Sequence, residues 1–169
     1  HARDARPLPV AWALAWLQAV PAQGGLLFCH PARRGEPGDP LADGSPFSVL
    51  AYLRQAAMLL AELLRSAGYA VLEAPDAEEA LAHWRSQPVA AVISDRHMPG
   101  DDGPRLLQHI ADDARAAGRA MPARILCTGH PDDAAALGVD TVLEKPVTLA
   151  ALHRALQAAG VHPAAAVSA

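Results

Sequence analysis

Three polar side chains follow apolar runs in this sequence, and together they could support phosphoryl chemistry. Asp95 follows VAAVIS, Thr128 ends ARILCT, and Lys145 follows TVLE. A carboxylate can attack phosphorus as a nucleophile, while an ammonium and a hydroxyl can stabilise the charge that spreads over the phosphoryl oxygens. We therefore assign Asp95 as the nucleophile, Lys145 as the cation that stabilises the phosphoryl charge, and Thr128 as the hydroxyl donor.

Each of these residues also has a purely structural interpretation. Asp95 would cap the turn that follows it, because turns often use Asp, and Lys145 would pair with it as a surface ion pair. Lys145 is, however, the single lysine of a chain with 13 arginines, and an arginine cannot replace its compact charge where space is tight. The occurrence of three such residues at successive strand ends favours the functional interpretation.

The elements that would position these residues alternate between strand and helix from about residue 54 onward. The expected strands are 69–74, 89–94, 123–128 and 141–144. Five helices are expected: one ends at residue 67, one begins after Asp76, two cover 103–117 and 132–137, and one begins after Thr148. Such alternation predicts an α/β fold, with a parallel sheet covered on both faces. Ligands of such sheets bind beyond the carboxyl ends of the strands, which is where the three polar residues would meet.

The first strand can be assigned in two ways. PFSVLAY (46–52) forms an apolar run that we favour as the first strand. In the alternative, Ser45 caps one long helix over 46–67, and LLFCH (26–30) is the first strand. Hydrophobic period alone does not decide between short apolar runs, so both assignments stay open.

Three segments together resemble a known family. SDRHMPGDDG, LCTG and LEKPV are similar to the receiver domain of two-component response regulators, and RHMPG is most similar to receivers of hybrid histidine kinases. The resemblance covers residues 54–160. It implies a flavodoxin-like, doubly wound sheet of five parallel strands in the order 2-1-3-4-5. The chain would then be a phosphoacceptor in signal transduction rather than an enzyme in the ordinary sense.

The resemblance also implies roles for individual residues. Asp95 would accept a phosphoryl group from a histidine kinase or a histidine phosphotransfer domain, and Thr128 and Lys145 would stabilise that group. The loops around the site would contain His97, Met98, Pro99 and Pro146, with a cis bond between Lys145 and Pro146.

The chain departs from the family at the metal site. Receivers carry two adjacent acids at the end of the first strand, which hold Mg²⁺ together with the phosphoacceptor. Counting back from Gly68 by the family's spacing places Ala51 and Tyr52 there, and neither offers a carboxylate to a hard cation. If LLFCH is the first strand instead, Cys29 and His30 occupy the positions of the acidic pair.

We therefore expect Mg²⁺ binding at Asp95 to be weak or absent, and phosphotransfer to be impaired. The alternative is a pseudo-receiver, a protein-interaction module that works without phosphate. Five other acids are candidate replacement ligands, although surface solvation is the expected role for all of them: Glu36, Asp39, Asp43, Asp101 and Asp102. Arg54 is a candidate counter-charge beside Asp95.

Two further departures concern signalling output. Val142 stands where the family often has an aromatic switch residue, and the interval from Thr128 to Lys145 is shorter than the family's. The fourth helix is therefore expected to be short, and coupling to a partner must differ from the usual mechanism.

The N-terminal part is expected to form an extension over 1–45, ahead of a receiver domain at 46–160 and a disordered tail at 161–169. PVAWALAWLQAV predicts an apolar helix with Trp12 and Trp16 one turn apart. This helix, the following glycine pair and the strand after it resemble the end of a histidine-kinase ATP-binding domain in degenerate form.

The composition of the chain argues against several other classes of function. The 14 basic and 18 acidic residues give a net charge of −4, which argues against a nucleic-acid-binding surface. The longest apolar stretch is too short to span a bilayer, and two cysteines make no disulfide framework. We expect a cytoplasmic location without direct membrane contact. A flavin-binding protein of the same fold is a weak alternative, because no phosphate-cradling loop follows the first strand.

Overall fold

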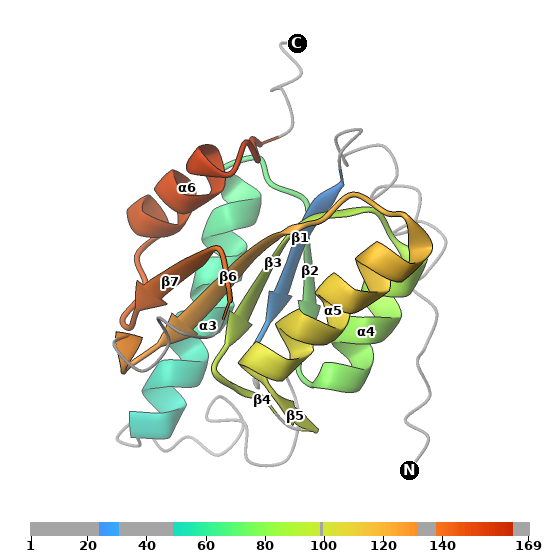
Figure 1. The fold of residues 1–169 in the computed structure, drawn as a ribbon. Helices are drawn as coiled ribbons and strands as arrows, with labels where there is room; N and C mark the ends of the chain where they lie inside the picture. Colours follow the sequence, from blue (N-terminus) through green and yellow to red (C-terminus); the bar gives the residue numbers. More distant parts are fainter. Residues whose placement is uncertain (1–23, 31–48, 99, 132–137, 164–169) are drawn as a thin grey trace, which may run out of the picture.

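The computed structural model describes residues 24–30, 49–98, 100–131 and 138–163 (Figure 1). Within these ranges the main sheet has five parallel strands in the order β2-β1-β3-β6-β7. Its strands are β1 (Gly25–Cys29), β2 (Val71–Ala74), β3 (Val89–Asp95), β6 (Ala123–Thr128) and β7 (Thr141–Glu144). Taken in chain order, these strands have the predicted order 2-1-3-4-5, so the flavodoxin-like fold is confirmed.

Helices cover both faces of this sheet (Figure 1). They are α3 (Val49–Ser66), α4 (Ala77–Ser86), α5 (Gly103–Ala117) and α6 (Leu149–Ala158). Residues of α4 and α5 pack on one face in a core that includes Trp84 and Ile110, while α3 and α6 pack on the other face around Leu64 and Leu152. None of the helices within the described ranges has the length and hydrophobicity that a membrane span requires.

The favoured assignment of the first strand is wrong. Residues 49–52 of PFSVLAY begin α3, so Ala51 and Tyr52 lie in a helix rather than at the end of a strand. The first strand is GLLFC, whose residues are all buried and which pairs with β2 on one side and β3 on the other. A strand in the middle of a parallel sheet needs a continuous apolar run, and GLLFC provides it, whereas residues 49–52 share the helical period of α3.

This correction also moves the start of the domain. The expected boundary at residue 46 would leave β1 in an N-terminal extension, but β1 is an inner strand of the main sheet. Gly24 explains how the chain enters this position. It has φ of +101°, and a Cβ atom there would lie 2.6 Å from the backbone carbon of Pro88, so only glycine fits.

Helix starts follow the predicted caps. Asp76 accepts a hydrogen bond from the Glu79 amide at 2.8 Å, and the Thr148 hydroxyl accepts one from the Ala151 amide at 3.1 Å. Other expectations lie outside the described residues, namely the helix over 132–137, the apolar helix over 9–20, the Ser45 cap, the 164–169 part of the tail, the side chain of Arg54, Pro99, and the acids Glu36, Asp39 and Asp43.

The start of α5 rests directly on the backbone of Asp95. The Gly103 amide donates to the Arg96 carbonyl at 2.7 Å, and a Cβ atom on Gly103 would lie only 2.0 Å from the Asp95 carbonyl oxygen. Asp102 caps the helix by accepting from the Arg105 amide at 2.8 Å. A side chain at residue 103 would therefore push α5 away from the strand that carries Asp95.

We predict that Gly103→Ala lowers the free energy of unfolding by about 1–3 kcal/mol, because overpacking against backbone forces a local shift. Urea unfolding followed by circular dichroism measures this change. Gly129→Ala is the matched control, since nothing lies within 4 Å of a Cβ atom at that position. Equal stability of the two variants would contradict the close approach at Gly103.

Candidate functional site

Asp95 and Lys145 meet at the carboxyl edge of the sheet. The Nζ atom of Lys145 lies 3.0 Å from Oδ1 of Asp95, and the two side chains are 33% and 19% exposed. Asp95 ends β3, and Lys145 directly follows β7, two strands away in the sheet. The contact therefore depends on strands that run parallel and end at one edge.

Thr128 belongs to the same edge. It follows Cys127, which is the register partner of Asp95, and its carbonyl accepts from the Lys145 amide at 2.9 Å. The Thr128 side chain is buried, and its hydroxyl oxygen accepts from the His130 amide at 3.1 Å. Because a hydroxyl that accepts in this way keeps its own proton, it can still donate to another oxygen.

The loop after Asp95 forms a short hairpin. His97 and Met98 make strand β4 (His97–Met98), which pairs antiparallel with β5 (Asp101–Asp102). The His97 side chain is exposed, while Met98 is buried in the core with α4 and α5. On the other side of the site, the peptide bond between Lys145 and Pro146 is cis, as expected.

Comparisons with known proteins agree with this geometry. A family model described as the response regulator receiver domain matches residues 54–157, which is more than half of the chain. This chain belongs to the response regulator receiver domain family. A search of curated proteins found no match.

Solved structures of receivers are similar in fold. The chemotaxis protein CheY4 of Vibrio cholerae has 21% identity and a TM-score of 0.56, with 79% of this chain and 96% of that chain covered. A CheY-like receiver domain from Methylobacillus flagellatus has 20% identity and a TM-score of 0.59 over the same shares. The signal receiver domain of an HD domain-containing protein from Pseudomonas fluorescens Pf-5 has 27% identity and a TM-score of 0.56, covering 79% and 91%.

This receiver is unusual at the end of β1. Cys29 is the register partner of Ser94, so His30 follows at the level of Asp95. Cys29 and His30 thus stand where the family's acidic pair is expected, and the prediction that Ala51 and Tyr52 replace that pair is wrong. The cause is the segment between β1 and α3, which makes the family's usual spacing from Gly68 inapplicable.

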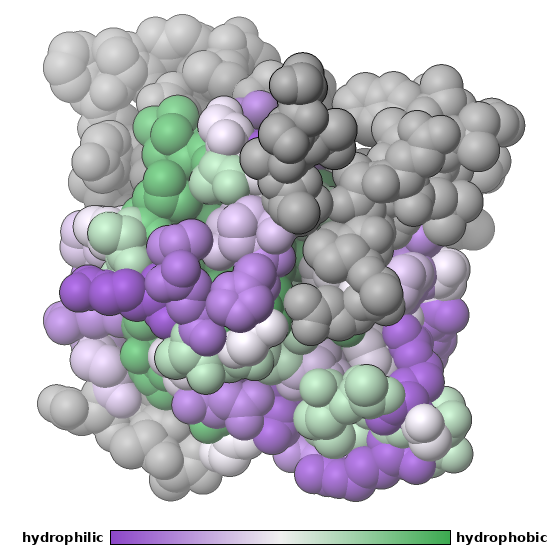
Figure 2. Space-filling model, turned by 90° about the horizontal axis from the view of Figure 1, so that it is seen from above, coloured by the Kyte–Doolittle hydropathy of each residue, from purple (hydrophilic) through white to green (hydrophobic). Residues whose placement is uncertain are grey.

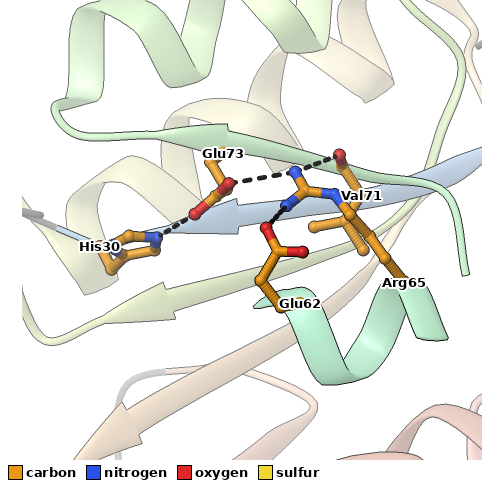
Figure 3. A network of polar contacts seen from close by, with 5 residues as sticks. All are labelled: His30, Glu62, Arg65, Val71 and Glu73. Atoms are coloured by element: carbon orange, nitrogen blue, oxygen red, sulfur yellow. Dashed lines mark hydrogen bonds and ion pairs between the residues drawn. The ribbon is translucent and has the colours of Figure 1, made fainter. Parts of the chain in front are cut away.

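The Nε2 atom of the His30 ring makes its contact on the side of β1 that faces β2, away from Asp95. It is 1% exposed, its Nε2 atom lies 2.9 Å from Oε1 of Glu73 on β2, and its centroid lies 5.0 Å from the ring of Phe28 (Figure 3). Since β2 and β3 flank β1 on opposite sides, the contact with Glu73 turns this nitrogen away from Asp95.

Glu73 links His30 to α3. Its Oε2 atom lies 3.0 Å from Nη2 of Arg65, whose guanidinium also contacts Oε1 of Glu62 at 3.1 Å and the carbonyl of Val71 at 3.0 Å (Figure 3). Burial raises the pKa of Glu73, but the hydrogen bond with His30 and the charge of Arg65 outweigh it, so the net pKa is below the ordinary value. Sequence reasoning missed this network, although an acid inside the apolar run YAVLEA was a signal for it.

The described residues do not fit a magnesium site of the family type. Among them, no group of three or more His, Cys, Asp or Glu side chains is arranged to hold a metal ion. Asp101 contacts Arg105 and His109 at 3.5 and 3.7 Å, and Asp102 caps α5. Both acids of the hairpin thus have structural contacts of their own.

The two cysteines beside Asp95 are held as thiols. Burial, and then the negative charge of Asp95, raise the pKa of Cys127 to about 12 and that of Cys29 further still. A thiolate is the reactive and metal-binding form of cysteine. Neither cysteine side chain is therefore a reactive nucleophile at neutral pH.

We predict that Glu73→Gln makes the protein less stable at neutral pH, by about 1 kcal/mol, because a charged hydrogen-bond acceptor is lost in a partly screened setting. A carboxyl with a lowered pKa stabilises the fold above its unfolded pKa of about 4.3, and this contribution disappears as pH falls through the folded value. The difference from the parent protein should therefore shrink below about pH 4.

Urea unfolding at a series of pH values measures this difference. Glu62→Gln is the control, since its side chain is 53% exposed and contacts only the outer end of the network. A Glu73→Gln deficit that stays constant down to acidic pH would contradict the proposed role of the carboxylate charge.

Proposed function

We propose that this receiver accepts a phosphoryl group on Asp95 from a phosphohistidine of a histidine kinase or a histidine phosphotransfer domain. The observation that carries the proposal is the 3.0 Å contact between Lys145 Nζ and Asp95 Oδ1. A cation at this distance can neutralise charge on an oxygen that becomes part of an acyl phosphate. Receiver domains in general act as phosphoacceptors in two-component signalling, which is consistent with this role.

The proposed step exchanges one bond to phosphorus for another. A carboxylate oxygen of Asp95 forms an O–P bond while the N–P bond to the partner's imidazole breaks, and the imidazole nitrogen keeps the electron pair and then takes a proton. Lys145 stabilises the charge on the phosphoryl oxygens, and the Thr128 hydroxyl donates a hydrogen bond to one of them. We also propose that the backbone carbonyl of His97, whose side chain is exposed, faces this site.

The end of β1 supports a second part of the proposal, namely that Mg²⁺ binds weakly and that phosphotransfer is slow. His30 adds no carboxylate to the site, so a negatively charged phosphoryl group must approach Asp95 with Lys145 as its main described counter-charge. Loss of one such electrostatic contact typically costs about 10²–10³-fold in rate. We therefore expect phosphorylation to be much slower than in receivers that carry the acidic pair.

A phosphate-independent pseudo-receiver is the second candidate function. The contact of buried His30 with Glu73 favours it, because the network with Arg65 engages a residue that stands where the family's acidic pair is expected. In this case the domain would act as a binding surface for a partner protein, and the ion pair of Asp95 and Lys145 would only stabilise the edge of the sheet.

The sequence RHMPG supports the proposal that this receiver is part of a hybrid histidine kinase. The proposed ATP-binding remnant has less support, because its only described strand is β1, which belongs to the receiver sheet itself. Any remnant would therefore be confined to the residues before β1.

We predict that incubation with MgCl₂ and a small phosphodonor adds one phosphoryl group to the protein, slowly, and that Asp95→Asn abolishes the gain. Intact-mass spectrometry over time measures both the extent and the rate. A second receiver with the acidic pair provides the reference rate. If the parent protein never gains mass under conditions that fully phosphorylate the reference, the pseudo-receiver is the correct function.

We also predict that Lys145→Ala reduces the rate of phosphorylation by about 10²-fold, because the charge next to the attacked phosphorus is lost. Its free energy of unfolding should change by less than about 1 kcal/mol, since partly exposed ion pairs contribute little. Arg105→Ala is the matched control, as it removes an exposed cation that contacts Asp101 rather than Asp95. An equal effect of both substitutions on the rate would exclude a direct role for Lys145.

A further inference from the structure

A buried cationic side-chain nitrogen lies one residue after Asp95. The Nη1 atom of Arg96 is shielded from solvent and has no hydrogen-bond partner among the described residues. A buried donor without an acceptor is unfavourable, and more so when the group is charged. The Arg96 guanidinium is therefore a group that gains most from an incoming anion.

Two other side chains in the described ranges have a buried nitrogen without a hydrogen bond, but their settings differ. The Nε1 atom of Trp84 belongs to a neutral ring. The Nε atom of Arg124 belongs to a guanidinium whose Nη2 atom lies 3.7 Å from Oδ1 of Asp140. Of these three groups, Arg96 is the charged one that makes no ion pair within the part of the chain that the structure describes.

The register of the sheet places Arg96 beside Thr128. Asp95 and Cys127 are register partners, and the pairing continues for one more residue, because the Arg96 amide donates to the Cys127 carbonyl at 3.0 Å. Arg96 and Thr128 are thus at one level on neighbouring strands, about 4.8 Å apart. Side chains at one level of a parallel pair share a face of the sheet. A phosphoryl oxygen that the Thr128 hydroxyl contacts is therefore near Arg96 as well.

The start of α5 holds the backbone of Arg96 from the other side. The Gly103 amide donates to the Arg96 carbonyl at 2.7 Å, and a Cβ atom on Gly103 would lie 3.1 Å from the Arg96 Cα atom. Arg96 is therefore fixed between α5 and β6, so its side chain starts from a defined point at the edge that carries Asp95.

We propose that the Arg96 guanidinium binds an oxygen of the phosphoryl group on Asp95, and thereby takes over part of the charge neutralisation expected from Mg²⁺ in this family. An arginine suits this role, because its planar set of N–H donors matches phosphate oxygens and is weakly hydrated. The inference rests on the proposed function, since it adds a contact to the same phosphoryl group. The exchange of bonds at phosphorus is unchanged, and Arg96 donates hydrogen bonds while it keeps its protons.

Phosphorylation of the full chain by phosphoramidate, with MgCl₂ or with a chelator, tests this proposal. The N–P bond of the donor breaks as the O–P bond to Asp95 forms, and the nitrogen leaves as ammonia after it takes a proton. Intact-mass spectrometry over time gives the rate. Arg96→Met removes the charge and keeps a long apolar side chain, whereas Arg96→Lys keeps the charge without the planar donors.

Arg124→Met is the matched control. Arg124 is also partly buried and also has a buried nitrogen without a hydrogen bond. It lies near the amino end of β6, however, whereas Asp95 lies at the carboxyl end of β3. Figure 2 views the molecule from the amino end of the sheet and shows hydrophilic and hydrophobic groups side by side there. An effect common to both variants would come from the loss of any such arginine.

We expect Arg96→Met to slow phosphorylation by about 10²-fold, both with MgCl₂ and with the chelator. Arg96→Lys should keep more of the rate, and Arg124→Met should match the parent protein. Arg96→Met should also unfold at no lower urea concentration than the parent, because it removes a buried donor that lacks an acceptor. If Arg96→Met fails to fold by circular dichroism, Arg96→Gln takes its place.

Equal rates for the parent protein and Arg96→Met would overturn this inference and leave the proposed function standing. A loss of stability without a loss of rate would also overturn it, because Arg96 would then have a structural role. So would an equal loss of rate in Arg124→Met. A parent protein that never gains a phosphoryl group would overturn both the inference and the proposed function.

Discussion

The contact between the Asp95 carboxylate and the Lys145 ammonium depends on one constraint, the parallel alignment of β3, β6 and β7. Two residues 50 positions apart in the chain lie 3.0 Å apart because their strands end at a common edge. The register of β3 against β6, and of β6 against β7, fixes this edge. Gly103 also supports this edge, because its lack of a side chain lets α5 begin in contact with the backbone of Asp95.

Charge balance explains how this receiver differs from others of its family. A site with two further carboxylates needs a divalent cation before a phosphoryl group can approach. Here the end of β1 carries Cys29, held as a neutral thiol, and His30, whose Nε2 atom contacts Glu73. The end of β1 therefore adds no carboxylate to the edge that carries Asp95. This difference in charge is the reason why we propose weak Mg²⁺ binding and slow phosphorylation.

The sequence allowed the fold and the central pair to be predicted for a physical reason. Apolar runs that end in polar residues indicate buried parallel strands, and chain order then places Asp95 and Lys145 at one edge. The first strand could not be assigned in the same way, because GLLFC and PFSVLAY are both short apolar runs. Counting from Gly68 assumed the usual distance between the first strand and the first helix, and residues 31–48 make that assumption wrong.

The network around His30 could not be predicted, since its members come from separate elements. His30 and Glu73 lie 43 residues apart and meet only because β1 pairs with β2 in one register. Arg65 reaches Glu73 from α3, whose start was itself assigned wrongly. Side-chain pairing of this kind depends on the packing of the whole sheet.

A magnesium titration tests the account most directly. Amide signals of Asp95 and Arg96 would be followed by nuclear magnetic resonance as MgCl₂ is added at constant ionic strength, with Asp95→Asn as the control. The account predicts that no saturable shift occurs in the parent protein at millimolar Mg²⁺. A saturating shift at Asp95 that disappears in Asp95→Asn would contradict it, because the site would then hold the metal without the family's acidic pair.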